Sequence, residues 1–480
     1  MNRRQFLTTL TGGAATIATI ADTTETSLVE AKPRSPFHLR GVYFHDGFTF
    51  EPQSHAPLHW DFEAWKRQIR WLHACGVNAV EFATMLEFNR IPSTEMEKRK
   101  IADRLKILDF VHSLGMKFGY LLTNTVLSTV PPEEEPSHQL KNRAITLCPR
   151  EPGNFEKTMA NPLFYMETYK EADFFEEFAA DWGGCECGKC GVPEFLRYVR
   201  SLAERLATLN PKATLYADTW CISFWRKNPM SGGWKGVFDR EISGSREVIT
   251  ALPTLPKNVG VALPSHHHYR PLTLTEYGGQ DKTPLFPVAA DVRQVHKAKR
   301  PMLAWPHFVM DDDAFRPKSW GIVHSEVRYI AALLQSLRKV GVDSVIGNLY
   351  LPLLQLSNTF AFGQLTENPS RKPEDILRDF ARLIVHREDV EKLTDTLFWL
   401  ENNSYWQQQM PPNGQLPDLP CALNRTEAGQ LASTLRPNPA RGLATRPPPF
   451  DRSYGVGEIG TARSRGLLKR MRNPICLFLP

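Results

Sequence analysis

The sequence predicts a (β/α)8 barrel, or TIM barrel, that spans residues 37–370 and is followed by a C-terminal helical extension. Strand-like apolar runs alternate with helix-like segments, and eight runs are the number that closes a parallel sheet. A glycine followed by an apolar residue repeatedly leads from a helix into the next strand, as at Gly76, Gly115 and Gly341. A doubly wound open sheet is the alternative, but no G-x-G-x-x-G motif follows the first strand.

The predicted elements follow one another in the order that a barrel requires. The strands are expected at 39–44, 77–82, 117–122, 172–178, 214–217, 259–263, 302–305 and 344–349. The clearest helices are expected at 61–74, 93–114, 193–209 and 324–340. In the first of these helices Trp65, Ile69 and Leu72 share one face. The Pro-rich stretch 268–299 is expected to be an irregular loop over the barrel mouth.

Residues 1–32 resemble a twin-arginine export signal. Arg3 and Arg4 are followed by Phe6 and Leu7 and then by a mildly apolar run, which is too short and too rich in Thr and Gly for a permanent membrane anchor. A disordered basic tail is the alternative. The signal predicts a periplasmic or extracellular protein that is not associated with a membrane once the signal is removed.

The end of the chain divides into a helical and an irregular part. Residues 371–410 show apolar side chains at helical spacing and are expected to form the extension, whereas residues 411–480 are rich in Pro and Arg and are expected to be disordered. From 436 to 480 there are nine Lys/Arg and two Asp/Glu, a balance of +7, while the whole chain carries +6. The remaining body is therefore close to neutral, which argues against a nucleic-acid partner.

Candidate catalytic residues follow from the rule that a TIM barrel presents its chemistry at the carboxyl ends of the strands. After the fourth strand come Glu176, Glu177 and Asp181, and the second strand presents Glu81 or Glu87. Because neighbouring residues on a strand face opposite sides, at most one of Glu176 and Glu177 points into the mouth. We expect Asp181 and Glu177 to form an acid/base pair, with Asp46 and Asp218 as further candidates.

Polar and aromatic residues at the other strand ends indicate a sugar or polyol ligand, because aromatic faces stack on sugar rings and polar groups bind hydroxyls. The expected platform is Trp220, Trp305 and Tyr350, with His267, His307 and Asn348 as hydroxyl-binding residues.

Several phrases resemble exported bacterial glycoside-hydrolase-like barrels, a group distantly similar to family 20 β-hexosaminidases and to α-glucuronidases. They are LRGVYFHDGFTFEP, WKRQIRWLHACGVNAVEF, LDFVHSLGMKFGY, FFEEFAADWGGCECGKC and NTFAFGQLTENPSRKPEDILRDFARLIV, within residues 37–400. The family 20 pattern has adjacent Asp and Glu after strand four, whereas this chain has Glu176-Glu177 and a displaced Asp181. The resemblance implies a glycosidase with two carboxyl groups and no required cofactor, acting on a carbohydrate with retention or inversion according to their separation.

Cys185, Cys187 and Cys190 form a C-x-C-x-x-C motif that has two interpretations. This spacing can bind Zn or an iron–sulfur cluster, with Cys221 or a mouth histidine as the fourth ligand. In an oxidising compartment two of the three could instead form a disulfide. The motif leaves open a metal-dependent barrel hydrolase or isomerase that uses Cys185, Cys187 and His267. A non-catalytic barrel that only binds glycans is the third possibility.

Overall fold

The computed structural model describes residues 35–44, 60–83, 91, 95–123, 126–127, 144–145, 147–179, 185, 187–220, 222–225, 233–265, 286–306, 325–349 and 355–403. The predicted signal at 1–32 and the predicted tail at 411–480 lie outside these residues. No helix within the described part is both long enough and apolar enough to cross a membrane.

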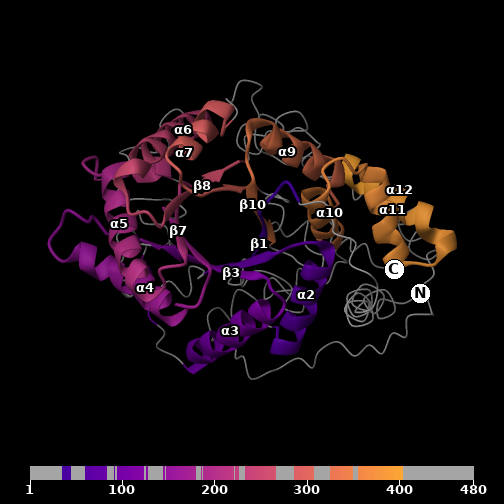
Figure 1. Ribbon diagram of the computed structural model, residues 1–480, viewed down its shortest axis with the longest axis horizontal. Coiled ribbons are helices and arrows are strands. Elements are labelled where there is room, and N and C mark those ends of the chain that lie inside the picture. Colours follow the sequence, from indigo (N-terminus) through magenta and orange to yellow (C-terminus); the bar gives the residue numbers. More distant parts are fainter. Residues whose placement is uncertain are drawn as a thin grey trace, which may run out of the picture.

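Eight parallel strands form a closed barrel, which confirms the predicted fold class (Figure 1). Around the ring the order is β1-β10-β9-β8-β7-β6-β3-β2. The strands are β1 (Leu39–Phe44), β2 (Ala79–Ala83), β3 (Lys117–Thr123), β6 (Phe174–Phe178), β7 (Thr214–Asp218), β8 (Val259–Pro264), β9 (Met302–Trp305) and β10 (Ser344–Leu349). A small antiparallel pair, β4 (Val126–Leu127) and β5 (Ala144–Ile145), follows β3 along the chain.

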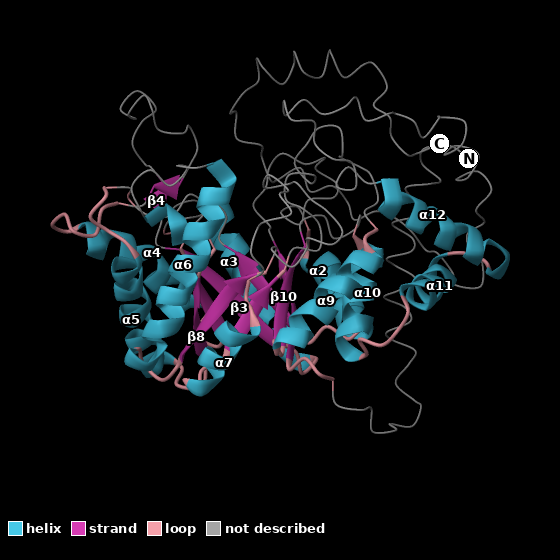
Figure 2. Ribbon diagram, turned by 90° about the horizontal axis from the view of Figure 1, so that it is seen from above, coloured by secondary structure: helices cyan, strands magenta, loops and turns pink. Residues whose placement is uncertain are grey.

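Helices surround the strands on the outside (Figure 2). They are α2 (Phe62–Cys75), α3 (Glu95–Ser113), α4 (Asn154–Thr168), α5 (Val192–Leu209), α6 (Gly233–Ala251), α7 (Ala289–Lys297), α9 (Val327–Val340) and α10 (Leu356–Glu367), with short 3-10 turns at Ile222–Trp225, Leu252–Thr254 and Arg387–Asp389. Local signals set the ends of α2: the Asp61 side chain accepts a hydrogen bond from the backbone N–H of Ala64, and Gly76 ends the helix with φ of 103°.

The prediction of an irregular segment at 268–299 is wrong for its last part, where α7 forms. Val292 and Val295 are buried against the barrel, and Asp291 accepts a hydrogen bond from the backbone N–H of Val288 at 3.0 Å. This hydrogen bond at the start of the helix and the burial of its apolar side outweigh the Pro-rich context upstream.

The barrel has two separate apolar cores. The larger one lies between the strands and the helices, and the smaller one lies inside the barrel. The smaller core comprises Leu39, Tyr43, Ala79, Leu121, Phe174, Tyr216, Trp220, Ala262, Leu303, Trp305 and Ile346. Gly119 makes room within it, because a Cβ atom there would lie 2.1 Å from the ring of Phe174. Residues that alternate with members of this inner core therefore face the helices.

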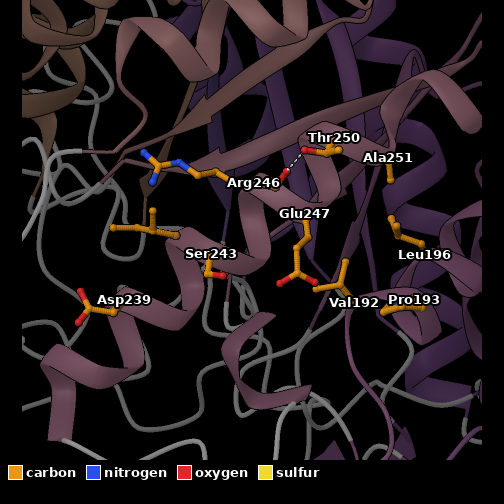
Figure 3. A pocket seen from close by; sticks show the side chains of 10 residues that line it. Val192, Pro193, Leu196, Asp239, Ser243, Arg246, Glu247, Thr250 and Ala251 are labelled. Atoms are coloured by element: carbon orange, nitrogen blue, oxygen red, sulfur yellow. Dashed lines mark hydrogen bonds between the residues drawn. The ribbon is translucent and has the colours of Figure 1, made fainter.

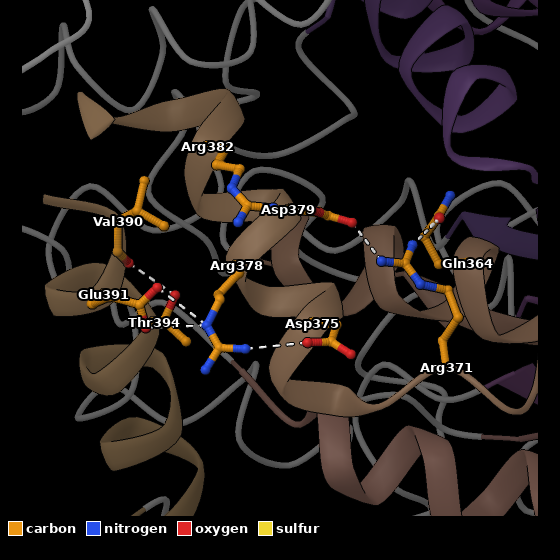
Figure 4. A network of polar contacts seen from close by, with 9 residues as sticks. All are labelled: Gln364, Arg371, Asp375, Arg378, Asp379, Arg382, Val390, Glu391 and Thr394. Carbon is orange, nitrogen blue, oxygen red and sulfur yellow. Dashed lines mark hydrogen bonds and ion pairs between the residues drawn. The ribbon is translucent and has the colours of Figure 1, made fainter. Parts of the chain in front are cut away.

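Two further helices, α11 (Pro373–Ile384) and α12 (Val390–Asn403), follow the last barrel helix and form the C-terminal extension (Figure 1). Phe380 of α11 packs on Phe360 of α10 with ring centroids 5.8 Å apart. On the polar side of α11, Arg378 binds Glu391 at 3.1 Å and Asp375 at 3.1 Å, and Arg371 and Arg382 both pair with Asp379 (Figure 4).

Candidate active site

Three acidic side chains lie inside the barrel, on three different strands. They are Glu81 of β2, Glu176 of β6 and Asp218 of β7, and each is fully buried. Strand register places Glu81 beside Tyr43 and Glu176 beside Tyr216, and both tyrosines belong to the inner core. These three carboxyl groups form the candidate active site.

The three carboxyl groups interact with one another rather than with basic side chains. Among the described residues, no donor from a nitrogen or hydroxyl group reaches the carboxyl oxygens of Glu81 and Glu176. Asp218 accepts one hydrogen bond from the backbone N–H of Trp220 at 2.9 Å. Glu176 lies close enough to Glu81 and Asp218 for the charges of both to act on it. Carboxyl groups that share a buried site cannot all ionise readily, so at least one of them keeps a proton.

Burial and mutual repulsion make the cluster resist ionisation. Burial, followed by the nearby charges of Glu81 and Asp218, raises the pKa of Glu176 well above its ordinary value. Burial and the charge of Asp218 also raise the pKa of Glu81. Burial raises the pKa of Asp218 to about 7, although the hydrogen bond from the backbone N–H of Trp220 opposes the rise.

These directions assign different protonation states to the three groups. Burial and the charges of both other acids raise the pKa of Glu176 well above its ordinary value, whereas the pKa of Asp218 rises only to about 7. Glu176 therefore keeps its proton more readily than Asp218, which ionises closer to neutral pH. Two carboxyl groups whose environments separate their roles in this way can serve as an acid and its ionised partner.

Aromatic side chains lie around the carboxyl groups at the carboxyl ends of the strands. Trp305 is the centre of this group: its ring lies 5.2 Å from Tyr43, 5.8 Å from Trp220 and 6.5 Å from Phe178 between centroids. Phe178 is only partly buried and Trp220 is 9% exposed, so the inner core keeps some contact with solvent at the ends of β6 and β7. Aromatic surface next to buried acids suits a ligand that has both apolar and hydroxyl-bearing faces.

The structure brings together four of the residues that the sequence predicted for the site: Asp218, Trp220, Trp305 and Asn348. Asn348 is fully buried on β10, in register with Tyr43 of β1. The remaining predicted residues, Asp181, Asp46, His267, His307 and Tyr350, lie outside the described residues.

Glu177 is placed differently from the expectation that it belongs to the mouth. It is in register with Leu122 and Ala217, which belong to the outer core, and its charge acts on Tyr198 of α5. Strand alternation thus turns Glu177 towards the helices and Glu176 into the barrel. The sequence could not choose between them, because β6 is buried on both faces and presents phenylalanine to each.

The cysteine motif lies outside the inner core, and a fourth thiol joins it. The Sγ atoms of Cys148, Cys185, Cys187 and Cys190 all lie within 4.8 Å of one another, and all four cysteines are free thiols. Cys148 had not been singled out, because 36 residues and a helix separate it from Cys185 in the sequence. Cys221, one of the expected fourth ligands, lies outside the described residues.

A surface groove of 730 Å³ lies elsewhere, between α5 and α6 on the outer layer of helices (Figure 3). It is lined by residues such as Val192, Leu196, Ser243 and Arg246. Arg246 is already bound to Asp291 at 2.9 Å, and the buried acids lie on the far side of the strands, inside the barrel. The groove therefore does not contain the candidate catalytic groups.

No family model and no curated protein matches the chain. Among solved structures, an O-GlcNAc hydrolase from Thermobaculum terrenum is 13% identical with a TM-score of 0.46, and the match covers 83% of this chain and 72% of that one. CpGH84B is 12% identical with a TM-score of 0.47, over 82% and 58% of the two chains. A GH138 enzyme targeting pectin rhamnogalacturonan II is 12% identical with a TM-score of 0.48, over 80% and 46%.

These likenesses are distant, and this chain spans less than two thirds of the length of the last two proteins. A shared function does not follow from similarity at this level, so what the protein does has to be derived from its own side chains.

Proposed function

We propose that the protein is a glycoside hydrolase whose acid is Glu176 and whose ionised partner is Asp218. The observation that carries the proposal is the position of Glu176: it is fully buried inside the barrel near Glu81 and Asp218, so that burial and their charges raise its pKa and favour its protonated form. Cleavage of a glycosidic bond needs one carboxyl group that donates a proton to the leaving oxygen and a second that is ionised.

The neighbouring groups support a sugar as the ligand. Trp220 and Trp305 offer apolar surface for one face of a pyranose ring, and Asn348 offers an amide for its hydroxyl groups. Glu81 would act as a positioning residue, because its charge, like that of Asp218, favours the protonated form of Glu176.

The separation of the two catalytic carboxyl groups decides the stereochemical outcome: about 5–5.5 Å in a retaining glycosidase and about 6.5–9.5 Å in an inverting one. A glycosidic oxygen that enters the site would accept the proton of Glu176. Ionised Asp218 would then attack the anomeric carbon or activate water.

The test is hydrolysis of a panel of nitrophenyl glycosides by the full chain, with Asp218→Asn as the comparison. We expect at least one glycoside to be cleaved and the substitution to reduce kcat by about 10²–10⁴-fold, because an amide cannot act as base or nucleophile. Sugar binding, measured by calorimetry, should change little. Binding without cleavage by the unmodified protein would contradict the proposal and favour a glycan-binding barrel.

Asp181→Asn belongs in the same assay, because Asp181 was predicted from the sequence to be part of the pair. If Asp181→Asn abolishes cleavage while Asp218→Asn does not, the ionised partner is Asp181 and our assignment of Asp218 is wrong.

A further inference from the structure

We propose that Cys148, Cys185, Cys187 and Cys190 bind one Zn²⁺ ion as a structural site with four thiolate ligands. The four Sγ atoms lie within 4.8 Å of one another and come from two separate parts of the chain. Cys148 precedes α4, and the other three lie between β6 and α5. Four convergent thiols are the ligand set of a closed zinc site, in which no coordination position remains for a substrate.

The spacing of the thiols fits a metal ion better than a covalent bond between them. Zn–S bonds of about 2.3 Å in a tetrahedron place neighbouring sulfur atoms about 3.8 Å apart. The Sγ atoms of Cys148 and Cys190 are separated by 3.8 Å. A disulfide would bring two sulfur atoms to about 2.05 Å and leave the other two cysteines without a shared role.

The surroundings of the thiols suit the negative charge of four thiolates around one Zn²⁺. The backbone N–H of Lys189 donates to Sγ of Cys187 at 3.3 Å, in a turn where Gly188 adopts φ of 76°. The cluster also lies at the start of α5, which begins at Val192, and the N-terminal end of a helix favours negative charge. Backbone N–H groups directed at the ligands are the usual second layer of such a site.

Metal binding here needs no change in oxidation state. Four Zn–S bonds form, and up to four thiol protons are released to solvent as the cysteines become thiolates. A disulfide would instead require an oxidant that accepts two electrons. Soft thiolate ligands favour Zn²⁺ over Mg²⁺ or Ca²⁺, which prefer oxygen.

The ion would fasten the segment after β6 to the segment before α4. Strand β6 carries Glu176, so the site would fix the second half of the connection that leads from the candidate active site to α5. Cys148, Cys185 and Cys190 contact the outer core rather than the barrel interior, which makes the role structural and not catalytic. The zinc site does not depend on the proposed glycosidase activity, and its test is independent of the test of that activity.

The test is the metal content of the purified full chain, measured by inductively coupled plasma mass spectrometry. We expect about one Zn per chain, lost in Cys148→Ser and Cys187→Ser and retained in Cys75→Ala. Cys75 is a matched control, because it is a free cysteine buried at the end of α2, away from the cluster. Cys187 is exposed, so its substitution should not disturb packing.

Cobalt gives a second measurement that does not depend on activity. Replacing Zn²⁺ by Co²⁺ should produce the visible bands of a tetrahedral thiolate site in the unmodified chain and in Cys75→Ala, but not in Cys187→Ser. Chain mass and free-thiol titration of the unreduced protein decide against the proposal if they show a disulfide among the four cysteines. Four free thiols that bind neither Zn²⁺ nor Co²⁺, when each is supplied in excess, would also overturn the proposal. So would iron found in place of zinc in the purified chain.

Discussion

Glu176 and Glu177 are neighbours in sequence but lie in different environments. Glu176 faces two other acids inside the barrel, whereas Glu177 faces the helix layer near Tyr198 of α5. Both are fully buried, so exposure alone cannot distinguish them. Their different roles come from strand alternation, which places one residue in each of the two cores of a barrel.

At the scale of residues, the sequence predicted which strands carry candidate side chains better than which of those side chains point inward. The rule that strand ends carry the chemistry selected Asp218, Trp220, Trp305 and Asn348, and the structure places all four in or beside the barrel interior. It could not rank Glu176 above Glu177, because the two faces of a parallel strand are equally buried. Glu81 was one of two candidates on its strand, and only the register with Tyr43 shows that it points inward.

At the scale of elements, the strands were predicted more closely than the connections between them. β1, β9 and β10 have the predicted bounds, because apolar runs bounded by Gly, Pro or Asp are specific to buried strands. The helices α4, α6 and α10 were not identified in the sequence. Helix α4 contains Pro162, and α10 is buried on most sides and mixes Ser, Asn, Thr and Gln with its apolar residues, so neither shows a clear amphipathic pattern.

The attachment of α11 provides a prediction at this scale. Phe380→Ala should lower the free energy of unfolding by about 3–5 kcal/mol, because the ring is 6% exposed and packs on Phe360. Arg378→Ala should cost less than about 1 kcal/mol, although it removes contacts to Glu391 and Asp375, because these ion pairs are solvent-exposed. Urea unfolding of both variants measures the difference. Equal losses would show that the ion pairs of Figure 4, and not the apolar face, hold the extension.

At the scale of the whole molecule, buried acids outside the candidate site also affect stability. Glu401 of α12 accepts hydrogen bonds from the backbone N–H groups of Arg328 and Tyr329 at 2.8 and 3.0 Å, at the start of α9. Burial raises its pKa to about 7, although these bonds oppose the rise. The folded protein therefore holds a proton on Glu401 that the unfolded chain loses near its ordinary pKa of 4.5.

The sign of the pH effect follows from this difference. Between about pH 4.5 and pH 7 the folded state binds more protons than the unfolded state, so the contribution of Glu401 to stability is lost as the pH rises. Glu401→Gln keeps an oxygen acceptor for both N–H groups but cannot ionise. Relative to the unmodified protein, the variant should gain about 1–3 kcal/mol between pH 5 and pH 8. Melting temperatures at the two pH values measure this gain, and an unchanged difference would show that Glu401 does not titrate in this range.

The central claim of this account is that Glu176, inside the barrel, is the acid of a glycosidase. The most direct test compares kcat of Glu176→Gln and Glu177→Gln on the best glycoside, with melting temperatures to confirm folding. We predict a loss of about 10²–10⁴-fold for Glu176→Gln, larger for a glycoside with a poor leaving group, and less than about tenfold for Glu177→Gln. A folded Glu176→Gln variant that retains its kcat, or a larger loss for Glu177→Gln, would contradict the claim.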